Sequence, residues 1–238
     1  MMRQYSSMVI KPNNGSTGRG IMKLEKNEQG WMLNIPATHS GHTRKNIFFK
    51  QKIPLYLRRK LRAESYIVQE TLPLATYNNK PFDLRVSVQK DLTGSWQITG
   101  IAGKVARKKR FLTNIAQGGS VYTFAHLLEA KTHLDLQEVK QNIELLSLKT
   151  VKQLEAHLPD LADLGLDVGI SEEGFPFFIE CNGKDLRISF RKGKMRKEWE
   201  DSYANPLGNA HYMMNLLGTK QDEEAIYNLD NEEHLLFQ

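Results

Sequence analysis

The sequence predicts an α+β fold whose strands pair mainly in antiparallel fashion. Over most of the chain, short apolar segments are separated by turn residues, which is typical of hairpins. One long segment, Leu136–Leu158, instead has apolar residues at helical spacing and stops before Pro159. We therefore expect antiparallel sheets to which a few helices are added.

The first third of the chain reads as strands with one helical segment. A turn-rich loop, residues 12–20, follows the first strand. Thr43–Arg62 is rich in Lys, Arg and long apolar residues, so we predict a helix that is interrupted near Pro54. The strands expected in this part are Tyr5–Lys11, Ile21–Glu25, Gly30–Ile35 and Tyr66–Gln69.

The rest of the chain adds further strands and a last helix. Asn205-Pro206 is a favourable N-cap and N1 pair, and it predicts a helix that continues to Leu217. The acidic tail after Thr219 is expected to be loosely held. The strand segments expected here are Phe82–Gln89, Trp96–Val105, Phe111–Ile115, Leu166–Ile170 and Phe175–Cys181.

The composition is that of an ordinary globular protein, with 238 residues of which 40% are hydrophobic and 25% charged. No run of about 18 apolar residues occurs, which argues against a membrane span. Met1–Ser7 lacks the apolar stretch of a signal peptide, so we expect a cytoplasmic protein. The single cysteine, Cys181, excludes an internal disulfide and a Cys-rich zinc site.

Charge is distributed unevenly along the chain. Residues 1–110 carry 21 Lys+Arg against 6 Asp+Glu, whereas residues 111–238 carry 12 against 21. A basic half favours an anionic partner such as a nucleic acid, a membrane surface or a phosphorylated small molecule. The basic runs Lys104–Arg110 and Arg191–Lys197 have no interleaved aromatic residues, so we favour solvated loops over nucleic-acid binding.

Carboxylates gather at the predicted hairpin around Gly174. If Glu173-Gly174 form a two-residue turn, Asp167 lies opposite Glu180 with Cβ atoms about 5 Å apart. Asn182 follows Glu180 by two residues and shares its face. Two carboxylates and an amide oxygen are donors that suit Mg²⁺. A solvated outer face is the alternative interpretation, and a longer turn would change this register.

Lys11 and the glycine-rich loop after it form a second candidate site. Residues 14–20 contain three glycines, whose backbone N–H groups could approach a polyanion closely, and Lys11 adds a positive charge. The pattern is not a Walker A motif, because no Gly-Lys-Ser/Thr sequence ends it. A flexible hairpin loop is the alternative interpretation.

A third group lies on the central predicted strands. Asp83 and Arg85 share one face of a strand and could form a purely structural ion pair or serve a function. Lys104 stands inside an apolar strand, and Asn114 follows it along the chain. Cys181 is expected to point into the core, and a role as nucleophile is not favoured because no partner His motif is present.

Taken in order, these residues resemble the ATP-grasp superfamily and, within it, the endospore coat-associated YheC/YheD family. The similarity extends from about residue 5 to residue 217. Each motif is loose, but their order and spacing together are specific. The stretches that carry the resemblance are Val9-Ile10-Lys11-Pro12 with the glycine loop, Tyr66–Glu70, Pro81–Val86, Thr113-Asn114, Gln117-Gly118-Gly119, Leu166–Gly169 and Phe178–Asn182.

The resemblance implies an ATP-grasp fold, in which two α+β subdomains with mostly antiparallel sheets have the nucleotide cleft between them. Residues 1–68 would form the small subdomain with the glycine-rich loop. Residues 69–218 would form the large subdomain with the Mg²⁺ site, and residues 219–238 an acidic C-terminal tail.

The resemblance also implies a nucleotide-binding role for residues of the first subdomain. Lys11 would contact the α- and β-phosphates of ATP, and the backbone at Gln69 and Glu70 would bind the adenine edge. The loop residues that would close over the phosphates are Gly15, Ser16, Gly18, Arg19 and Gly20.

For the large subdomain, the resemblance implies residues that bind the reacting end of ATP. Lys104 and Asn114 would face the γ-phosphate or an acyl phosphate, with Arg85 close by. Lys104 stands where relatives typically have Arg. A lysine ammonium group would act on the phosphate as a point charge, where an arginine would make a bidentate contact. The Mg²⁺ ligands would be Asp167, Glu180 and Asn182.

The expected activity is that of an ATP- and Mg²⁺-dependent ligase, in which a carboxylate is activated as an acyl phosphate and attacked by an amine or similar nucleophile. Its partners would be ATP, an unidentified carboxylate or amine substrate, and spore-coat proteins. The alternative is a nucleotide-binding or inactive relative that acts in spore-coat assembly, with the spore coat as its location. A basic nucleic-acid binder is a third, less favoured interpretation.

Overall fold

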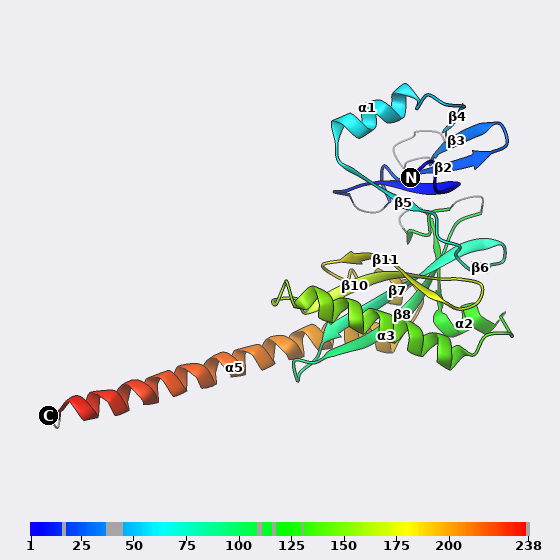
Figure 1. The fold of residues 1–238 in the computed structure, drawn as a ribbon. Helices are drawn as coiled ribbons and strands as arrows, with labels where there is room; N and C mark the ends of the chain where they lie inside the picture. The colour runs from blue at the N-terminus through cyan, green and yellow to red at the C-terminus, as the bar shows by residue number, and fades with distance from the viewer. Residues whose placement is uncertain (16–17, 37–44, 109–110, 116–117, 130, 237–238) are drawn as a thin grey trace. The chain divides into compact units, whose positions relative to one another are not determined.

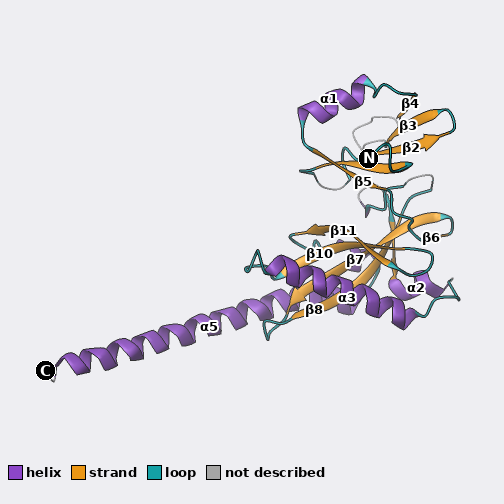
Figure 2. Ribbon diagram, viewed as in Figure 1, coloured by secondary structure: helices purple, strands orange, loops and turns teal. Residues whose placement is uncertain are grey.

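The structure is a computed structural model of the chain. It describes all residues except 16–17, 37–44, 109–110, 116–117, 130 and 237–238, and over residues 219–236 it describes the backbone alone. Strands and helices alternate irregularly along the chain, and the strand pairings are antiparallel wherever a register is defined (Figure 2). The predicted α+β class with mostly antiparallel sheets is confirmed.

The first sheet has five strands in the order β4–β3–β2–β1–β5 (Figure 1). Apolar side chains alternate along these strands and form a core, to which helix α1 (Leu55–Ala63) contributes Leu57. β5 lies at one edge of the sheet and pairs with β1. The strand bounds are Ser7–Pro12 (β1), Met22–Asn27 (β2), Gly30–Ile35 (β3), Lys45–Phe49 (β4) and Tyr66–Glu70 (β5).

The second sheet has the order β11–β10–β7–β8–β9, and the short strand β6 pairs with β7. Helix α3 (Leu136–Glu155) lies along this sheet (Figure 1). Helices α2 (Phe124–Glu129) and α4 (Ile188–Lys192) are short. The strand bounds are Thr76–Tyr77 (β6), Lys80–Lys90 (β7), Trp96–Val105 (β8), Ser120–Thr123 (β9), Asp163–Ile170 (β10) and Pro176–Asn182 (β11).

Strands β7 and β10 separate apolar from polar residues onto two faces, because successive side chains of a strand point in opposite directions. One face consists of the fully buried pairs Leu84–Val168, Val86–Leu166 and Val88–Leu164. The other face carries the polar pairs Arg85–Asp167 and Gln89–Asp163, with Ser87 opposite Gly165 between them. Two of the predicted site residues are therefore neighbours across the sheet.

Two segments have a secondary structure that differs from the predicted one. Thr43–Arg62 is not one interrupted helix: β4 occupies its first part, where Ile47 and Phe49 alternate toward Leu33 and Trp31 of the neighbouring strand, and the helix begins only after Pro54. Phe111–Ile115 is not a strand. Its buried Thr113 uses its hydroxyl to bind a side chain instead, and the next strand starts at Ser120.

The predicted hairpin around Gly174 forms, but its turn is longer than expected. The Ser171 N–H donates to the Phe175 carbonyl at 2.9 Å, and the Gly174 N–H donates to the Ser171 carbonyl at 3.0 Å. Gly174 has φ of +80°, as in a three-residue loop that ends in a glycine bulge. The two-residue turn, and the cross-strand register calculated from it, are therefore wrong.

The last helix is longer than predicted. It begins at Arg196 instead of Asn205 and continues to Leu236 (α5, 41 residues), through the tail that was expected to be loosely held. Pro206 lies inside it, and because proline has no N–H, the Ser202 carbonyl four residues earlier has no helical partner. Gln89 Nε2 and Arg187 Nε donate to that carbonyl at 2.9 and 2.8 Å.

The chain divides into two compact units. One consists of Met1–Asp83, Gly103–Asp135 and Gly169–Phe177, and the other of Leu84–Ala102, Leu136–Val168 and Phe178–Gln238. The subdomain boundaries at residues 68 and 218 stay predictions.

Candidate functional site

The glycine loop lies between β1, which carries Lys11, and β2. Gly18 and Gly20 have φ of +73° and +75°, a conformation that residues with a Cβ rarely adopt. A Cβ on Gly20 would also lie 2.8 Å from Pro12 Cγ. Gly15 and Arg19 are exposed, Lys11 is half-buried, and Ser16 is outside the described residues. At Gly18 and Gly20 the loop thus has a conformation that suits glycine better than any other residue.

The same loop meets Asn114. A Cβ on Gly18 would lie 2.5 Å from Asn114 Nδ2 and 3.6 Å from Leu112 Cδ1, so the backbone of Gly18 packs directly against these side chains. Residues almost a hundred positions apart in the sequence, both predicted to face phosphates, are therefore adjacent in the first unit. Phe111 lies nearby, with Lys23 Nζ 5.9 Å from the centre of its ring.

Lys104 is buried next to Asp83. Lys104 is 3% exposed, and its Nζ lies 3.1 Å from Asp83 Oδ1, while the Thr113 hydroxyl donates to Asp83 Oδ2 at 2.6 Å. Because a buried ammonium group needs a counter-charge, Asp83 keeps the Lys104 cation in this position. Asp83 also binds Thr113, the residue that precedes Asn114 in the sequence. The expected pairing of Asp83 with Arg85 is not the one found.

Arg85 pairs across the sheet with Asp167. Its Nη2 lies 3.2 Å from Asp167 Oδ1, and its Nη1 donates to the Gly165 carbonyl at 3.2 Å. Asn182 Nδ2 donates to the same carbonyl at 3.1 Å. Arg85 reaches these partners across Gly165, where a Cβ would lie 2.3 Å from Nη1. The second unit therefore brings together Arg85, Asp167 and Asn182.

The chemistry of the donor set fits the proposed metal. Asp167 and Glu180 offer carboxylate oxygens, and Asn182 has its amide nitrogen engaged with Gly165, so its Oδ1 is the atom left for a cation. Oxygen ligands of this kind suit Mg²⁺, which also keeps waters and substrate phosphates. Among the described residues, no group of three or more His, Cys, Asp and Glu side chains is placed so that it could hold a metal ion. The assignment of these three ligands stays a prediction.

Cys181, between two of those residues, is half-buried and does not belong to the core, contrary to expectation. Burial raises the pKa of its thiol, and the charges of Asp167 and Glu180 raise it further, against the opposing effect of Arg85. The thiol is therefore protonated at neutral pH, which disfavours a nucleophilic role.

Gln69 and Glu70 end the edge strand β5, and both are exposed. β5 pairs with β1 on one side only, with Gln69 opposite Val9 and Glu70 opposite Met8. An edge strand presents backbone N–H and C=O groups that another group can bind. This position suits the predicted contact with an adenine edge.

Sequence reasoning missed two supporting residues. Thr113 was quoted in a motif without a role, yet it holds Asp83. Gly165 was not singled out, although an interior strand glycine commonly marks a place where another group approaches the backbone closely. That signal was available in the sequence.

The glycine loop after Lys11 and the antiparallel sheets are features that were expected of an ATP-grasp protein. The family model described as YheC/D-like ATP-grasp matches residues 1–213, and the chain belongs to this family. The chain is 26% identical over 189 residues to "Endospore coat-associated protein YheD" of Bacillus subtilis (strain 168), which covers 78% of this chain and 41% of that protein.

The chain is also 25% identical over 219 residues to "Endospore coat-associated protein YheC" of the same organism, covering 89% of this chain and 58% of that one. It thus spans about half the length of these relatives. Among solved structures, the ADP complex of N5-carboxyaminoimidazole ribonucleotide synthetase matches with a TM-score of 0.39 and 12% identity, over 76% of this chain and 35% of that one. In the part that the structure describes, no helix is long and apolar enough to span a bilayer.

Proposed function

We propose that this chain binds ATP together with Mg²⁺ and acts as an ATP-dependent carboxylate–amine ligase. The observation that carries the proposal is the contact of Gly18 with Asn114, which follows Thr113, the residue that shares Asp83 with the buried Lys104. Backbone N–H groups of a glycine loop, an amide and a desolvated ammonium group are the donors that a triphosphate requires. Lys11, on the strand that leads into the loop, adds a second cation.

The reaction would proceed by two displacements. A carboxylate oxygen of the substrate attacks the γ-phosphorus of ATP, and ADP leaves with the electrons of the broken P–O bond. An amine then attacks the carbonyl carbon of the acyl phosphate, inorganic phosphate leaves, and the amine releases its proton to solvent. This chemistry depends on positioning and charge neutralisation and requires no covalent protein nucleophile.

Each candidate residue has a defined task in this scheme. Lys104 and Asn114 would bind the transferred phosphoryl group, and Arg85 would neutralise charge close to it. Bound Mg²⁺, which neutralises the phosphates, would be held by the ligands Asp167, Glu180 and Asn182. In the structure Arg85 pairs with Asp167, so its cation holds that carboxylate in place.

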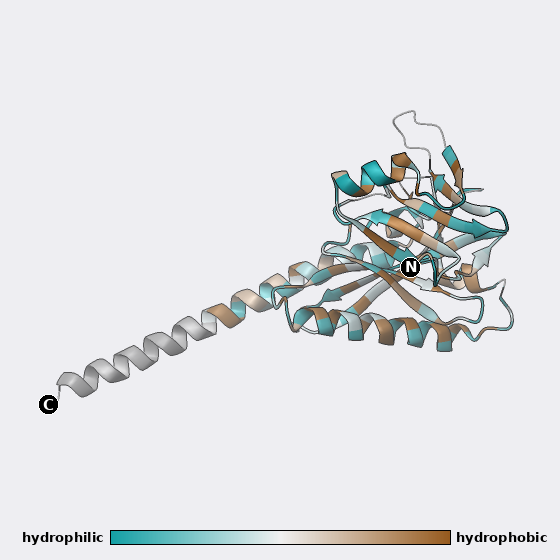
Figure 3. Cartoon of the chain, turned by 45° about the horizontal axis from the view of Figure 1, so that its top comes forward, coloured by the Kyte–Doolittle hydropathy of each residue, from teal (hydrophilic) through white to brown (hydrophobic). Residues whose placement is uncertain are grey.

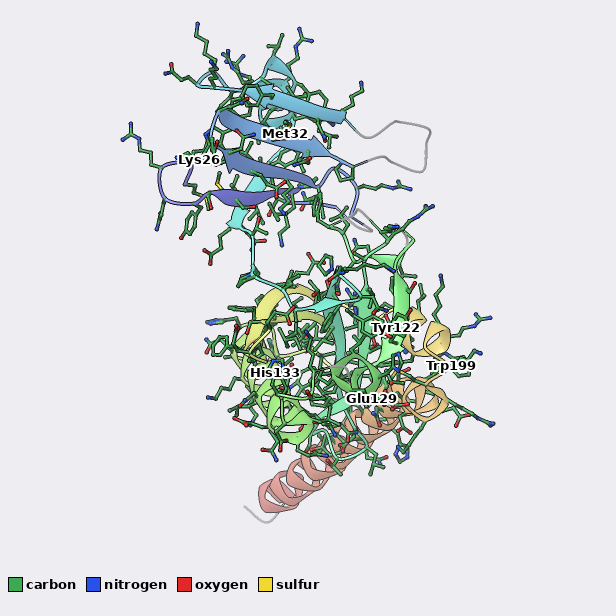
Figure 4. The ribbon with its side chains drawn as sticks, turned by 90° about the vertical axis from the view of Figure 1, so that its right-hand side faces the viewer. Lys26, Met32, Tyr122, Glu129, His133 and Trp199 are labelled. Atoms are coloured by element: carbon green, nitrogen blue, oxygen red, sulfur yellow. The ribbon has the colours of Figure 1, made fainter. Side chains whose placement is uncertain are left out.

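The test is calorimetric titration of the chain with ATP, in the presence and absence of Mg²⁺. We expect Mg²⁺-dependent binding, which Lys11→Met weakens at least tenfold, whereas Lys26→Met leaves it unchanged. Lys26 is an exposed lysine of the same sheet and serves as the matched control (Figure 4). Equal affinities of the Lys11→Met and Lys26→Met variants would overturn the phosphate assignment.

The second candidate function is spore-coat assembly without catalysis, which the names of both relatives favour. ADP release in the presence of carboxylates and amines separates the two. For a ligase, Glu180→Gln abolishes Mg²⁺-dependent ADP release. For an assembly protein, deletion changes the coat composition of spores while Glu180→Gln does not.

A further inference from the structure

Helix α1 exposes arginine side chains on the face that points away from the first sheet. Leu57, on the inner face of the helix, is 2% exposed and belongs to the core of that sheet. Four residues spaced by three and four positions lie on the opposite face, and all of them are exposed. This outward stripe consists of Leu55, Arg58, Arg59 and Arg62.

The chain around this stripe is positive as well. Between Glu28 and Glu64 the sequence has eight Lys and Arg and no Asp or Glu. Lys50 and Lys52, which precede the helix, are exposed. In the part of the chain that the structure describes, Glu64 is the one carboxylate paired with a cation of α1, and its Oε1 lies 3.8 Å from Lys60 Nζ. The arginines of the stripe can therefore bind an anionic partner.

The stripe is separate from the nucleotide site proposed above. Through Leu57, α1 packs on the face of the first sheet that holds Met8 and Ile10. Lys11 follows Ile10, and its side chain points to the other face because successive side chains of a strand alternate. The sheet therefore lies between the stripe and Lys11, so a ligand of the stripe is not the phosphate group proposed for Lys11.

Aliphatic side chains are exposed among these cations. Leu55, in the stripe itself, is 60% exposed, and Ile53, next to Lys52, is 38% exposed. Tyr56 is 40% exposed and has the amphipathic ring that is common at membrane interfaces. Figure 3 shows that hydrophobic and hydrophilic residues follow each other along α1. Exposed aliphatic side chains are stabilised when they leave water, and a partner that offers charge alone gives them no apolar surroundings.

We propose that this surface of α1 binds peripherally to a bilayer of anionic lipids. The arginines of the stripe, with Lys50 and Lys52, bind lipid phosphates, while Ile53 and Leu55 enter the boundary between headgroups and acyl chains. A nucleic acid uses cations for its backbone and aromatic rings for its bases, so exposed aliphatic side chains among the cations favour a bilayer. The proposal does not depend on ATP binding or catalysis.

Flotation of the intact chain with vesicles tests the association. The chain is expected to float with vesicles made of equal parts of phosphatidylglycerol and phosphatidylcholine, and not with phosphatidylcholine alone. Replacing the three arginines of the stripe by Gln is expected to weaken binding about tenfold or more. The matched control replaces three exposed cations of the other unit by Gln and keeps the affinity; these are Arg191, Lys192 and Lys194. No binding by the parent chain, or equal losses in the two triple variants, overturns the proposal.

An aliphatic substitution distinguishes a bilayer from a soluble polyanion. Leu55→Gln leaves the charge unchanged and is expected to weaken vesicle binding about tenfold, because a buried leucine is lost. Leu158→Gln, at an exposed leucine just after α3, is the matched control and keeps the affinity. If Leu55→Gln has no effect and single-stranded RNA binds the chain as tightly as the vesicles do, the site is one for nucleic acid and the proposal is overturned.

A fluorescent label tests which part of the chain meets the bilayer. In a Cys181→Ser background, an environment-sensitive fluorophore on Leu55→Cys is expected to shift its emission to shorter wavelengths when anionic vesicles are added. The same fluorophore on Leu158→Cys is expected to show no shift. If the labelled chain floats with the vesicles but the emission at position 55 does not change, the contact lies elsewhere and the proposal is overturned.

Discussion

Arg85 reaches Asp167 only because Gly165 has no side chain. The guanidinium group crosses the strand at the Gly165 Cα and gives one hydrogen bond to the Gly165 carbonyl and one ion pair to Asp167. Asn182 binds the same carbonyl. A single backbone carbonyl thus orients both a cation and a predicted metal ligand.

Gly165→Ala is expected to displace Arg85 and to lower the free energy of unfolding by about 1–3 kcal/mol, as overpacking in a buried site does. Urea denaturation measures the change. Gly183→Ala, where a Cβ would meet no atom within 4 Å, is the control and is expected to be neutral. Arg85→Ala should remove most of the additional cost of Gly165→Ala. If Gly165→Ala lowers the free energy of unfolding equally in the Arg85→Ala variant and in the parent chain, the steric explanation is contradicted.

Residue types and their spacing allowed candidate site residues to be proposed from the sequence, and these assignments stay predictions. The sequence did not allow their pairings to be named. Asp83 and Arg85 share one strand, yet Asp83 binds Lys104 and Arg85 binds Asp167. Which partner each takes depends on neighbouring strands, whose register is fixed by turns such as the three-residue loop before Phe175.

A polar network around Gln89 stabilises the first turns of helix α5. This fully buried side chain donates from Nε2 to Asp163 at 2.8 Å and to the Ser202 carbonyl, and its Oε1 accepts from Thr99 at 2.7 Å. Arg187 Nη2 binds the other oxygen of Asp163 at 2.6 Å. The network replaces the hydrogen bond that Pro206 removes, which is why the helix does not end there.

Gln89→Met keeps the size of the side chain but leaves its partners without their hydrogen bonds. We expect a loss of about 2–4 kcal/mol in the free energy of unfolding, measured by urea denaturation, because buried polar groups are costly when unpaired. Gln141→Met, at an exposed position of α3, is the matched control and should change little. A similar small effect at both positions would show that the network does not stabilise the helix.

The elements that sequence reasoning predicted well are those with strong local patterns, such as α3 and the β2–β3 hairpin. Its errors arose where long-range contacts decide the structure. Pro206 normally ends or begins a helix, and only the distant Gln89 and Arg187 allow the chain to continue. β4 lacks a clear local signal, and its pairing with β3 determines its conformation.

At the level of the whole chain, Glu172 joins segments that are far apart in the sequence. It accepts hydrogen bonds from the Thr76 N–H and from the Lys131 ammonium group, and its carbonyl binds His133 Nε2 at 2.9 Å. Burial alone raises the pKa of its carboxyl, but the hydrogen bonds from Lys131 and Thr76 outweigh burial and hold that pKa below its ordinary value.

Because the folded-state pKa of Glu172 is depressed, its stabilisation is present above the pKa of the unfolded chain and is lost as pH falls through the lower folded value. Urea denaturation between pH 3 and pH 7 is expected to show stability falling on the acid side. Glu172→Gln should flatten this acid limb, whereas Glu28→Gln, at an exposed turn, should not. Parallel profiles for both variants would contradict the role of Glu172.

The pairing of β1 with β5 has a consequence for the order of folding. Val9 pairs with Gln69, 60 residues later, whereas β2, β3 and β4 pair with neighbours along the chain. Closing a long loop costs more conformational entropy than closing a short one. On the ribosome the strands β1–β4 can pair as they emerge, and β5 joins last. The edge of the sheet that is predicted to meet adenine is thus completed only after the strand that carries Lys11 is already in place.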